Sequence, residues 1–153
     1  MQKSIRESLT QLLAAGAVVM LTVPGQAFFA AAAVGADKLK VVYHISEAEK
    51  VPFALNNIRN HIKGVGGADN VEIIVVAHGP GLRPFHAAET PVKISSLVSE
   101  LQLEGVAFNA CGNTMNAMRF ALSDLLPDFV RRDEGGVVRL AELQSKGYVY
   151  IRP

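Results

Sequence analysis

The chain has 153 residues, half of them apolar, with a formal charge of +1, one cysteine and no tryptophan. This length suits a single domain, and the lone cysteine excludes an internal disulfide framework and a zinc site built on paired cysteines. The near-balanced charge creates no basic field that would attract nucleic acid or an acidic membrane, so we expect no nucleic-acid partner.

The N-terminal segment has the pattern of a secretory signal peptide. Lys3 and Arg6 precede a weakly polar to apolar run over 12–23, and small residues at 34–36 form a cleavage pattern. We therefore expect residues 1–36 to be an export signal and residues 37–153 to be the mature domain. Such a domain works outside the cytoplasm, and we expect a periplasmic protein.

Two features of this segment leave alternatives open. Cleavage after Ala27 also satisfies the small-residue rule, so the boundary lies between 27 and 36. The stretch 12–36 is also long enough to span a bilayer as an uncleaved anchor, although Pro24 and Gly25 interrupt it. A cleaved signal would leave the domain without stable membrane contact, whereas an anchor would hold it at the membrane by its N-terminus.

From residue 39 onward, short apolar runs alternate with segments of helical periodicity, which is typical of a parallel sheet covered by helices. We expect strands over 39–45, 71–77, 105–110, 129–131 and 148–152. Helices are expected over 51–64, 90–101 and 112–126, with a last one between Asp133 and Gly147, and a polar, glycine-rich loop over 78–89. These elements predict one α/β sandwich built on five strands.

Polar residues gather where the first three expected strands end. The set consists of His44, His78, Asn109, Cys111, Gly112 and Asn113. Because open parallel sheets bind their ligands at the carboxyl ends of the strands, we expect these residues to converge on one edge of the sheet. They are the candidate site residues.

Cys111 carries the sharpest hypothesis among them. It lies at a strand-to-helix junction, where the partial positive charge of the helix N-terminus favours a thiolate, the nucleophilic form of cysteine. The alternative is that a lone cysteine at the end of an apolar strand is a small buried hydrophobe. Export bears on which of these two interpretations of Cys111 holds. In an oxidising compartment an unpaired thiol is oxidised unless it is buried, chemically blocked or part of a functional site.

The histidines and glycines are less specific. His78 and His44 could act as acid, base or thiolate partner, or could satisfy local backbone hydrogen bonds. A metal site made from His44, His78 and Cys111 is conceivable, but no metal-ligand spacing supports it, so we expect no metal and no cofactor. A phosphate loop, a nucleophile-elbow serine and paired carboxylates at strand ends are all missing, which removes the commonest hydrolase classes.

Four segments resemble the DsrE/DsrF-like family, known for sulfur-relay systems: VEIIVVAHGPGL, VAFNACGNTM, LNNIRNHI and GVVRLAELQSKGYVYIRP. The resemblance covers residues 39–153. It implies a three-layer α/β/α domain with a five-stranded, mainly parallel sheet, and assembly into homo- or hetero-oligomers. In the active relay subunits a cysteine carries sulfur as a persulfide, and by its position in the motif this role falls on Cys111. Family subunits without a cysteine there are partners that transfer no sulfur.

Two points limit what carries over from the family. The familiar relay members work in the cytoplasm, whereas this chain begins with an export signal, so the sulfur donor and acceptor stay undefined. With one cysteine, a persulfide on Cys111 must be resolved by another molecule. The leading hypothesis is a secreted thiol protein that carries sulfane sulfur on Cys111, with Asn109 or Asn113 hydrogen-bonding the sulfur and His78 moving a proton. The competing hypothesis is a non-catalytic oligomeric binding or assembly module with a buried Cys111.

Overall fold

A five-stranded parallel sheet forms the centre of the domain in a computed structural model that describes residues 38–153. Its strands are β1 (Leu39–Ile45), β2 (Val71–Ala77), β3 (Ala107–Cys111), β4 (Phe129–Arg132) and β5 (Val149–Ile151), in the order β4-β3-β2-β1-β5. All four neighbouring pairs are parallel. The predicted sheet is confirmed, while the predicted export signal lies outside the described residues.

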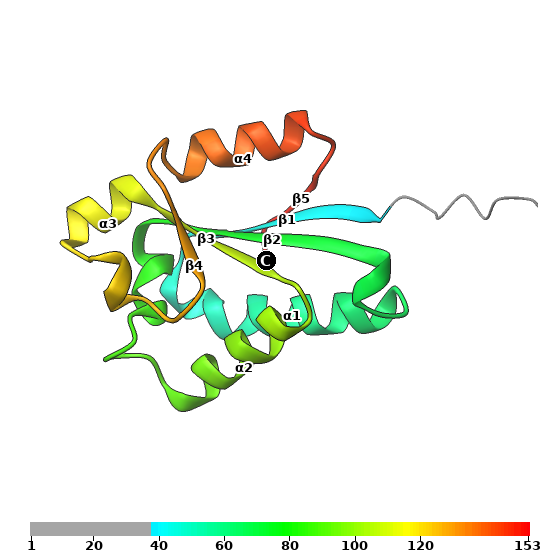
Figure 1. The fold of residues 1–153 in the computed structure, drawn as a ribbon, viewed down its shortest axis with the longest axis horizontal. Helices are drawn as coiled ribbons and strands as arrows, with labels where there is room; N and C mark the ends of the chain where they lie inside the picture. The colour runs from blue at the N-terminus through cyan, green and yellow to red at the C-terminus, as the bar shows by residue number, and fades with distance from the viewer. Residues whose placement is uncertain (1–37) are drawn as a thin grey trace, which may run out of the picture. The chain divides into compact units, whose positions relative to one another are not determined.

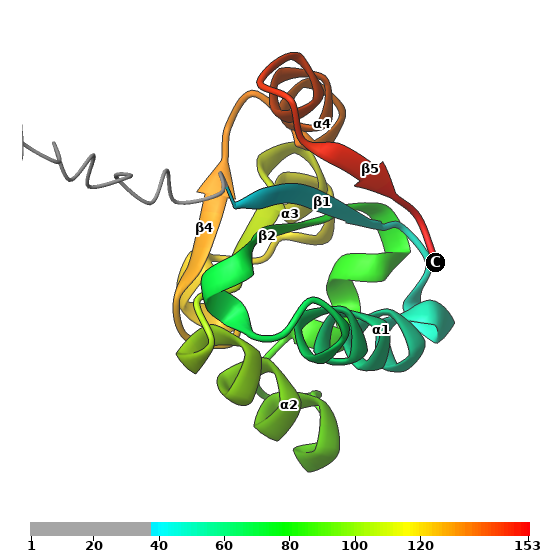
Figure 2. The ribbon, with the colours of Figure 1, turned by 90° about the vertical axis from the view of Figure 1, so that its right-hand side faces the viewer.

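Helices cover both faces of this sheet (Figures 1 and 2). They are α1 (Val51–Gly64), α2 (Val92–Leu103), α3 (Gly112–Met118) and α4 (Gly136–Ser145). Strands β1 to β4 follow one another across the sheet, and right-handed connections keep α1 and α2 on one face. The chain then crosses from β4 to the opposite edge, which places α4 on the other face and confirms the three-layer α/β/α architecture. No helix among residues 38–153 has the length and apolar character to cross a bilayer.

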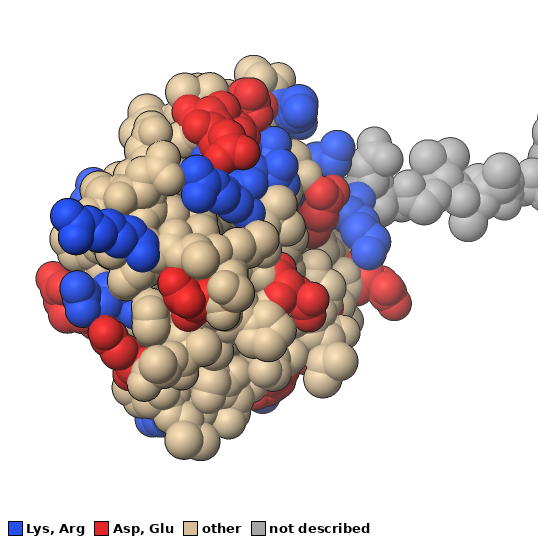
Figure 3. Space-filling model, turned by 60° about the vertical axis from the view of Figure 1, so that its left-hand side comes forward, with Lys and Arg blue, Asp and Glu red and all other residues tan. Residues whose placement is uncertain are grey.

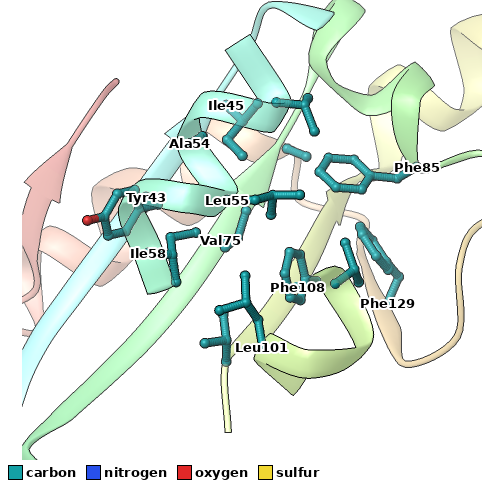
Figure 4. Packing of buried hydrophobic residues seen from close by; sticks show 14 of the residues in the cluster. Tyr43, Ile45, Ala54, Leu55, Ile58, Val75, Phe85, Leu101, Phe108 and Phe129 are labelled. Atoms are coloured by element: carbon teal, nitrogen blue, oxygen red, sulfur yellow. The ribbon is translucent and has the colours of Figure 1, made fainter. Parts of the chain in front are cut away.

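The larger core lies between the sheet and the α1/α2 layer (Figure 4). Successive side chains of a strand point to opposite faces, so Tyr43 and Val75 of the strands meet Leu55 and Leu101 of the helices. Three phenylalanines extend this core, with ring centroids 5.1 Å apart for Phe85 and Phe129 and 5.2 Å for Phe108 and Phe129. The apolar burial that holds the fold together is concentrated on this face.

The smaller core lies under α4 and has six buried members: Val42, Ile74, Val76, Leu140, Leu143 and Tyr148. Helix α4 covers this face of the sheet (Figure 1). The strand residues His44, Asn109 and Cys111 alternate with members of the larger core and therefore point to the α4 side. The fold thus leaves its polar strand ends beside α4.

The segment expected as a polar loop over 78–89 is largely a 3-10 helix, Gly79–Phe85, so that prediction was wrong. Leu82 and Phe85 in it are fully buried. In a 3-10 helix, residues three apart share one side, which points both of these side chains into the larger core. Their burial fixes the connection that follows β2.

The helix expected over 112–126 ends much earlier, at Met118. Arg119 adopts a left-handed conformation with φ 59°, and the Phe120 N–H donates to the Met115 carbonyl over 2.9 Å. This six-to-one bond is the signature of a Schellman termination. Phe120 then packs against the larger core, and that burial is the physical reason for the early stop. The last helix likewise begins at Gly136 with Gly135 as its N-cap, later than the expected Asp133.

Candidate functional site

Cys111 ends β3 and is the residue immediately before α3. It is a free thiol, and only 6% of its surface is exposed. Its backbone is extended, with φ −66° and ψ 117°, as expected for a residue that caps the start of a helix. The side chain therefore lies at the carboxyl edge of the sheet, on the face that α4 covers.

Several polar groups favour the thiolate form of Cys111. They are the Thr114 hydroxyl and the backbone N–H groups of Thr114, Gly136 and Asn113, whose hydrogen bonding lowers the pKa of the thiol. These N–H groups belong to the first turns of two helices, α3 and α4, whose N-termini favour negative charge. Burial raises the pKa of Cys111, but the hydrogen bonds outweigh this effect and hold the pKa below its ordinary value. The site therefore stabilises the thiolate.

Thr114 is a candidate site residue that the sequence pattern did not predict. The Gly79 N–H donates to its Oγ1 over 2.8 Å. A hydroxyl that accepts one hydrogen bond keeps its own proton for donation, and hydrogen bonding from this hydroxyl helps to lower the pKa of Cys111. Thr114 thus connects the backbone that follows β2 to the thiolate at the end of β3. Its only sequence signal was its position three residues after Cys111.

Gly136 lets the first turn of α4 approach the cysteine. An ideal Cβ at this position would lie 3.1 Å from the His78 Cβ and 3.2 Å from the Cys111 Cβ. Either neighbour would have to yield to a side chain there. The preceding Gly135 has φ 91°, a conformation that side-chain-bearing residues rarely adopt. This glycine pair was also not identified, although two glycines before a helical pattern are a visible signal.

A pocket of about 260 Å³ opens beside the sulfur. Its lining residues are His78, Cys111, Asn113, Thr114, Glu134, Gly135, Gly136, Val137 and Val138. Three candidates from the sequence, His78, Cys111 and Asn113, therefore share one pocket. The pocket joins the ends of β2 and β3 to the first turn of α4.

His44 lies outside this pocket and reaches it only through His78. The two Nε2 atoms are 2.5 Å apart, and the His44 Nδ1 is 2.6 Å from the Tyr150 hydroxyl. Burial lowers the pKa of His44 to about 4, with His78 and Arg152 adding to the shift. Burial, then Arg152, also lowers the pKa of His78. Both imidazoles are therefore neutral near pH 7.

Asn109 and Gly112 contact β4, the strand beside the site, and do not line the pocket. Asn109 is buried, and its Oδ1 accepts hydrogen bonds from Arg132 Nε at 2.8 Å and Arg139 Nε at 3.1 Å. A Cβ at Gly112 would lie 2.8 Å from the Arg132 carbonyl oxygen. Neither residue lines the pocket, so Asn109 holds β4 and α4 together while Gly112 permits the close approach of β4.

Charge and metal-ligating groups around the domain are dispersed. On the face in Figure 3, acidic and basic side chains are interspersed with uncharged surface. Within residues 38–153, no three His, Cys, Asp or Glu side chains are arranged to hold a metal ion.

Fold and site together define a class: a three-layer α/β domain with a lone cysteine beside a pocket at the carboxyl edge of a parallel sheet. A family model described as the DsrE/DsrF-like family matches residues 37–153. The chain belongs to this family, whose members generally serve in sulfur relay.

Two solved structures are similar to the chain. One, a protein of unknown function from Methanobacterium thermoautotrophicum, has 33% identity and a TM-score of 0.67, over 76% of this chain and 100% of its own. The other, the ychN protein from E. coli, has 14% identity and a TM-score of 0.61, over 75% of this chain and 99% of its own. The second likeness concerns the fold alone. No curated protein matches the chain.

Proposed function

We propose that the protein is a sulfur carrier, or the sulfur-transferring subunit of a relay, which takes up sulfane sulfur as a persulfide on Cys111. The observation that carries this proposal is the position of Cys111, which ends β3 and lines a pocket together with Thr114 and Gly136. Hydrogen bonding from these neighbours supports the proposal, because it lowers the pKa of the thiol. A thiolate is the form that attacks sulfur, and the adjoining pocket gives a small donor room to approach it.

The uptake step is a displacement at sulfur. The Cys111 thiolate attacks the outer sulfur of a donor persulfide, R–S–S⁻, and the donor S–S bond breaks. The products are the Cys111 persulfide anion and R–S⁻, so that atoms and charges balance and no oxidant is consumed. Because the chain has one cysteine, release requires a nucleophile from another molecule, as befits a carrier.

Intact-mass measurement tests this proposal. The purified protein is incubated with polysulfide or thiosulfate, with Cys111→Ser as the control. We expect a gain of one or more sulfur atoms on the wild-type protein alone. An unchanged mass, together with no native-state labelling of Cys111 by a small alkylating reagent, contradicts the carrier function.

The compartment and assembly of the protein are part of the same proposal. We infer export to the periplasm through the signal in residues 1–36, with an N-terminal membrane anchor as the alternative, and assembly into homo- or hetero-oligomers. The N-terminal pattern and the family membership support these inferences. Cell fractionation distinguishes a soluble periplasmic protein from an anchored one, and light scattering measures the oligomer.

One observation favours a second candidate function. Cys111 is only 6% exposed, as expected for a small buried residue in a non-catalytic binding or assembly module. Such a module would keep the fold and hold a small ligand at the carboxyl edge of the sheet. Native-state alkylation separates the two functions, because a carrier requires a sulfur that small reagents reach.

A further inference from the structure

A continuous row of side chains connects the surface to the Cys111 pocket. Tyr150, on the edge strand β5, is 39% exposed, and its hydroxyl lies 2.6 Å from the His44 Nδ1. The His44 Nε2 lies 2.5 Å from the His78 Nε2, and His78 lines the pocket together with Cys111. Three strands, β5, β1 and β2, position these side chains at one end of the sheet.

The geometry of the two rings fixes how protons are shared. Their centroids are 4.7 Å apart and their planes differ by only 19°, while the two Nε2 atoms are 2.5 Å apart. The rings therefore meet edge to edge, and one proton lies between the facing nitrogens. A neutral imidazole has one N–H and one acceptor nitrogen. The position of one proton in the row therefore determines which nitrogen of the next ring carries its proton.

When the Tyr150 hydroxyl donates to the His44 Nδ1, the His44 proton must lie on Nε2, where it is donated to the His78 Nε2. The proton of His78 then lies on Nδ1. If that proton leaves, each remaining proton in the row moves one position toward His78, and the Tyr150 phenolate regains a proton from water. The row can thus deliver a proton without storing charge on either ring.

The charged groups near His44 and His78 are compatible with proton transfer through neutral rings. Arg152 and Glu47 are the charged groups that influence His44 and His78, and the two are hydrogen-bonded to each other. Their opposite effects on the rings partly cancel, while burial keeps both imidazoles neutral at neutral pH. Neutral rings accept a proton on one nitrogen as they release one from the other, which a doubly protonated imidazolium cannot do.

We propose that Tyr150 and His44 form a proton relay that supplies His78, and through it the leaving group of the sulfur-uptake step at Cys111. This inference rests on the proposed function and assigns its donor class: persulfides that release a thiol. The leaving R–S⁻ takes the Nδ1 proton of His78 to become R–SH. The proton of His44 then moves onto the His78 Nε2, that of Tyr150 moves onto the His44 Nδ1, and solvent reprotonates Tyr150. In total one proton is consumed for each sulfur transferred.

Thiosulfate is the informative contrast to such a donor. Its transfer to the Cys111 thiolate releases sulfite, which is stable as an anion and needs no proton to leave. The relay should therefore speed sulfur transfer from donors that release a thiol, and it should not affect transfer from thiosulfate.

The test compares single-turnover loading of Cys111 from glutathione persulfide and from thiosulfate, followed by intact mass. Tyr150→Phe removes the exposed end of the relay. Tyr43→Phe is the matched control, because the Tyr43 hydroxyl also lies near a histidine nitrogen, the His61 Nδ1 at 3.0 Å, on the opposite face of the sheet. We expect Tyr150→Phe to slow persulfide loading about tenfold and leave thiosulfate loading unchanged, with Tyr43→Phe changing neither rate.

A second variant, His44→Asn, interrupts the relay at its centre and should give the same donor-selective loss. Equal slowing with both donors in both variants would show a structural role. No slowing with either donor would show that Tyr150 and His44 have no role in loading. Each of these results would overturn the relay alone. Loading of the wild-type protein from neither donor would overturn the proposed function and the relay with it.

Discussion

At the scale of single residues, the state of Cys111 depends on one side chain more than on any other, Thr114. Its hydroxyl accepts from the Gly79 N–H at 2.8 Å, and hydrogen bonding from the same hydroxyl lowers the pKa of Cys111. A hydrogen bond to a charged group contributes about 1.5–3 kcal/mol, which is enough to change the thiolate population about tenfold or more.

Removal of this hydroxyl gives the first prediction. Thr114→Val keeps the shape of the side chain and should raise the pKa of Cys111, so that alkylation by iodoacetamide near pH 7 slows about tenfold. Only the thiolate reacts, so the alkylation rate follows the pKa of Cys111. In the wild-type protein the rate should rise at a lower pH than it does for an ordinary thiol. In Thr114→Val the rise should move to higher pH. Thr114→Ser, which keeps the hydroxyl, should behave like wild type. Identical profiles for wild type and Thr114→Val would refute this role.

The sequence reveals part of this site. Cys111, His78 and Asn113 could be predicted because strand ends of a parallel sheet share one edge. The contact between His44 and Tyr150 could not, because these residues are 106 positions apart and meet only when β5 pairs with β1. Gly136 could not be predicted as a site residue for a similar reason, because its contact with the site depends on where the first turn of α4 lies in space.

At the scale of elements, the first turn of α4 is held against the ends of β2 and β3. The contact depends on a missing side chain at Gly136, since a Cβ there would come within 3.2 Å of both His78 and Cys111. Overpacking of this kind typically costs about 1–3 kcal/mol.

Gly136→Ala should therefore destabilise the domain by about 1–3 kcal/mol in urea unfolding and slow the alkylation of Cys111. Gly64→Ala is the matched control, because a Cβ at that helical position would meet nothing within 4 Å. We expect that variant to have unchanged or slightly increased stability. Equal stability of the two variants would show that α4 does not press on the site.

Helix α2 offers a sharper test of the larger core. Leu101 is fully buried, whereas Leu103, on the same helix, is 91% exposed. Leu101→Ala should lower the free energy of unfolding by about 2–5 kcal/mol, whereas Leu103→Ala should change it by less than about 0.5 kcal/mol. Similar losses in denaturant titrations of both variants would place the core elsewhere.

Sequence patterns predicted the strands and long helices because period-two and helical repeats of apolar residues are local signals. The early end of α3 and the 3-10 helix after β2 were missed for a shared reason. Phe120 and Phe85 are set by tertiary packing, which overrides a helical or loop-like local pattern. The missed elements are therefore the ones whose apolar residues lie outside regular periodicity.

At the scale of the whole molecule, the carrier function requires a partner at the pocket. Val137 and Val138 line the pocket and are 70% and 49% exposed. Exposed apolar residues beside a reactive group are suited to a protein contact. We therefore expect the partner, or a second copy of the chain, to cover this rim.

Light scattering of the purified protein at micromolar concentration should show self-association or, with its partner, a hetero-oligomer. Val137→Asp should weaken that association, because it buries a charge in the contact. Val92→Asp, at a 79% exposed valine on α2, should have no effect. A strictly monomeric protein would remove the homo-oligomer from the proposal, and equal weakening by both variants would place the contact away from the pocket.

The central claim is that Cys111 both gains and releases a sulfur atom, and one turnover measured by mass tests it most directly. The protein is exposed to glutathione persulfide, freed of donor, weighed, and then treated with cyanide, which takes up sulfane sulfur as thiocyanate. We expect a gain of one sulfur atom on Cys111 that disappears with release of an equal amount of thiocyanate. An unchanged mass, or a gain of the whole glutathione moiety as a mixed disulfide, would contradict a sulfur carrier.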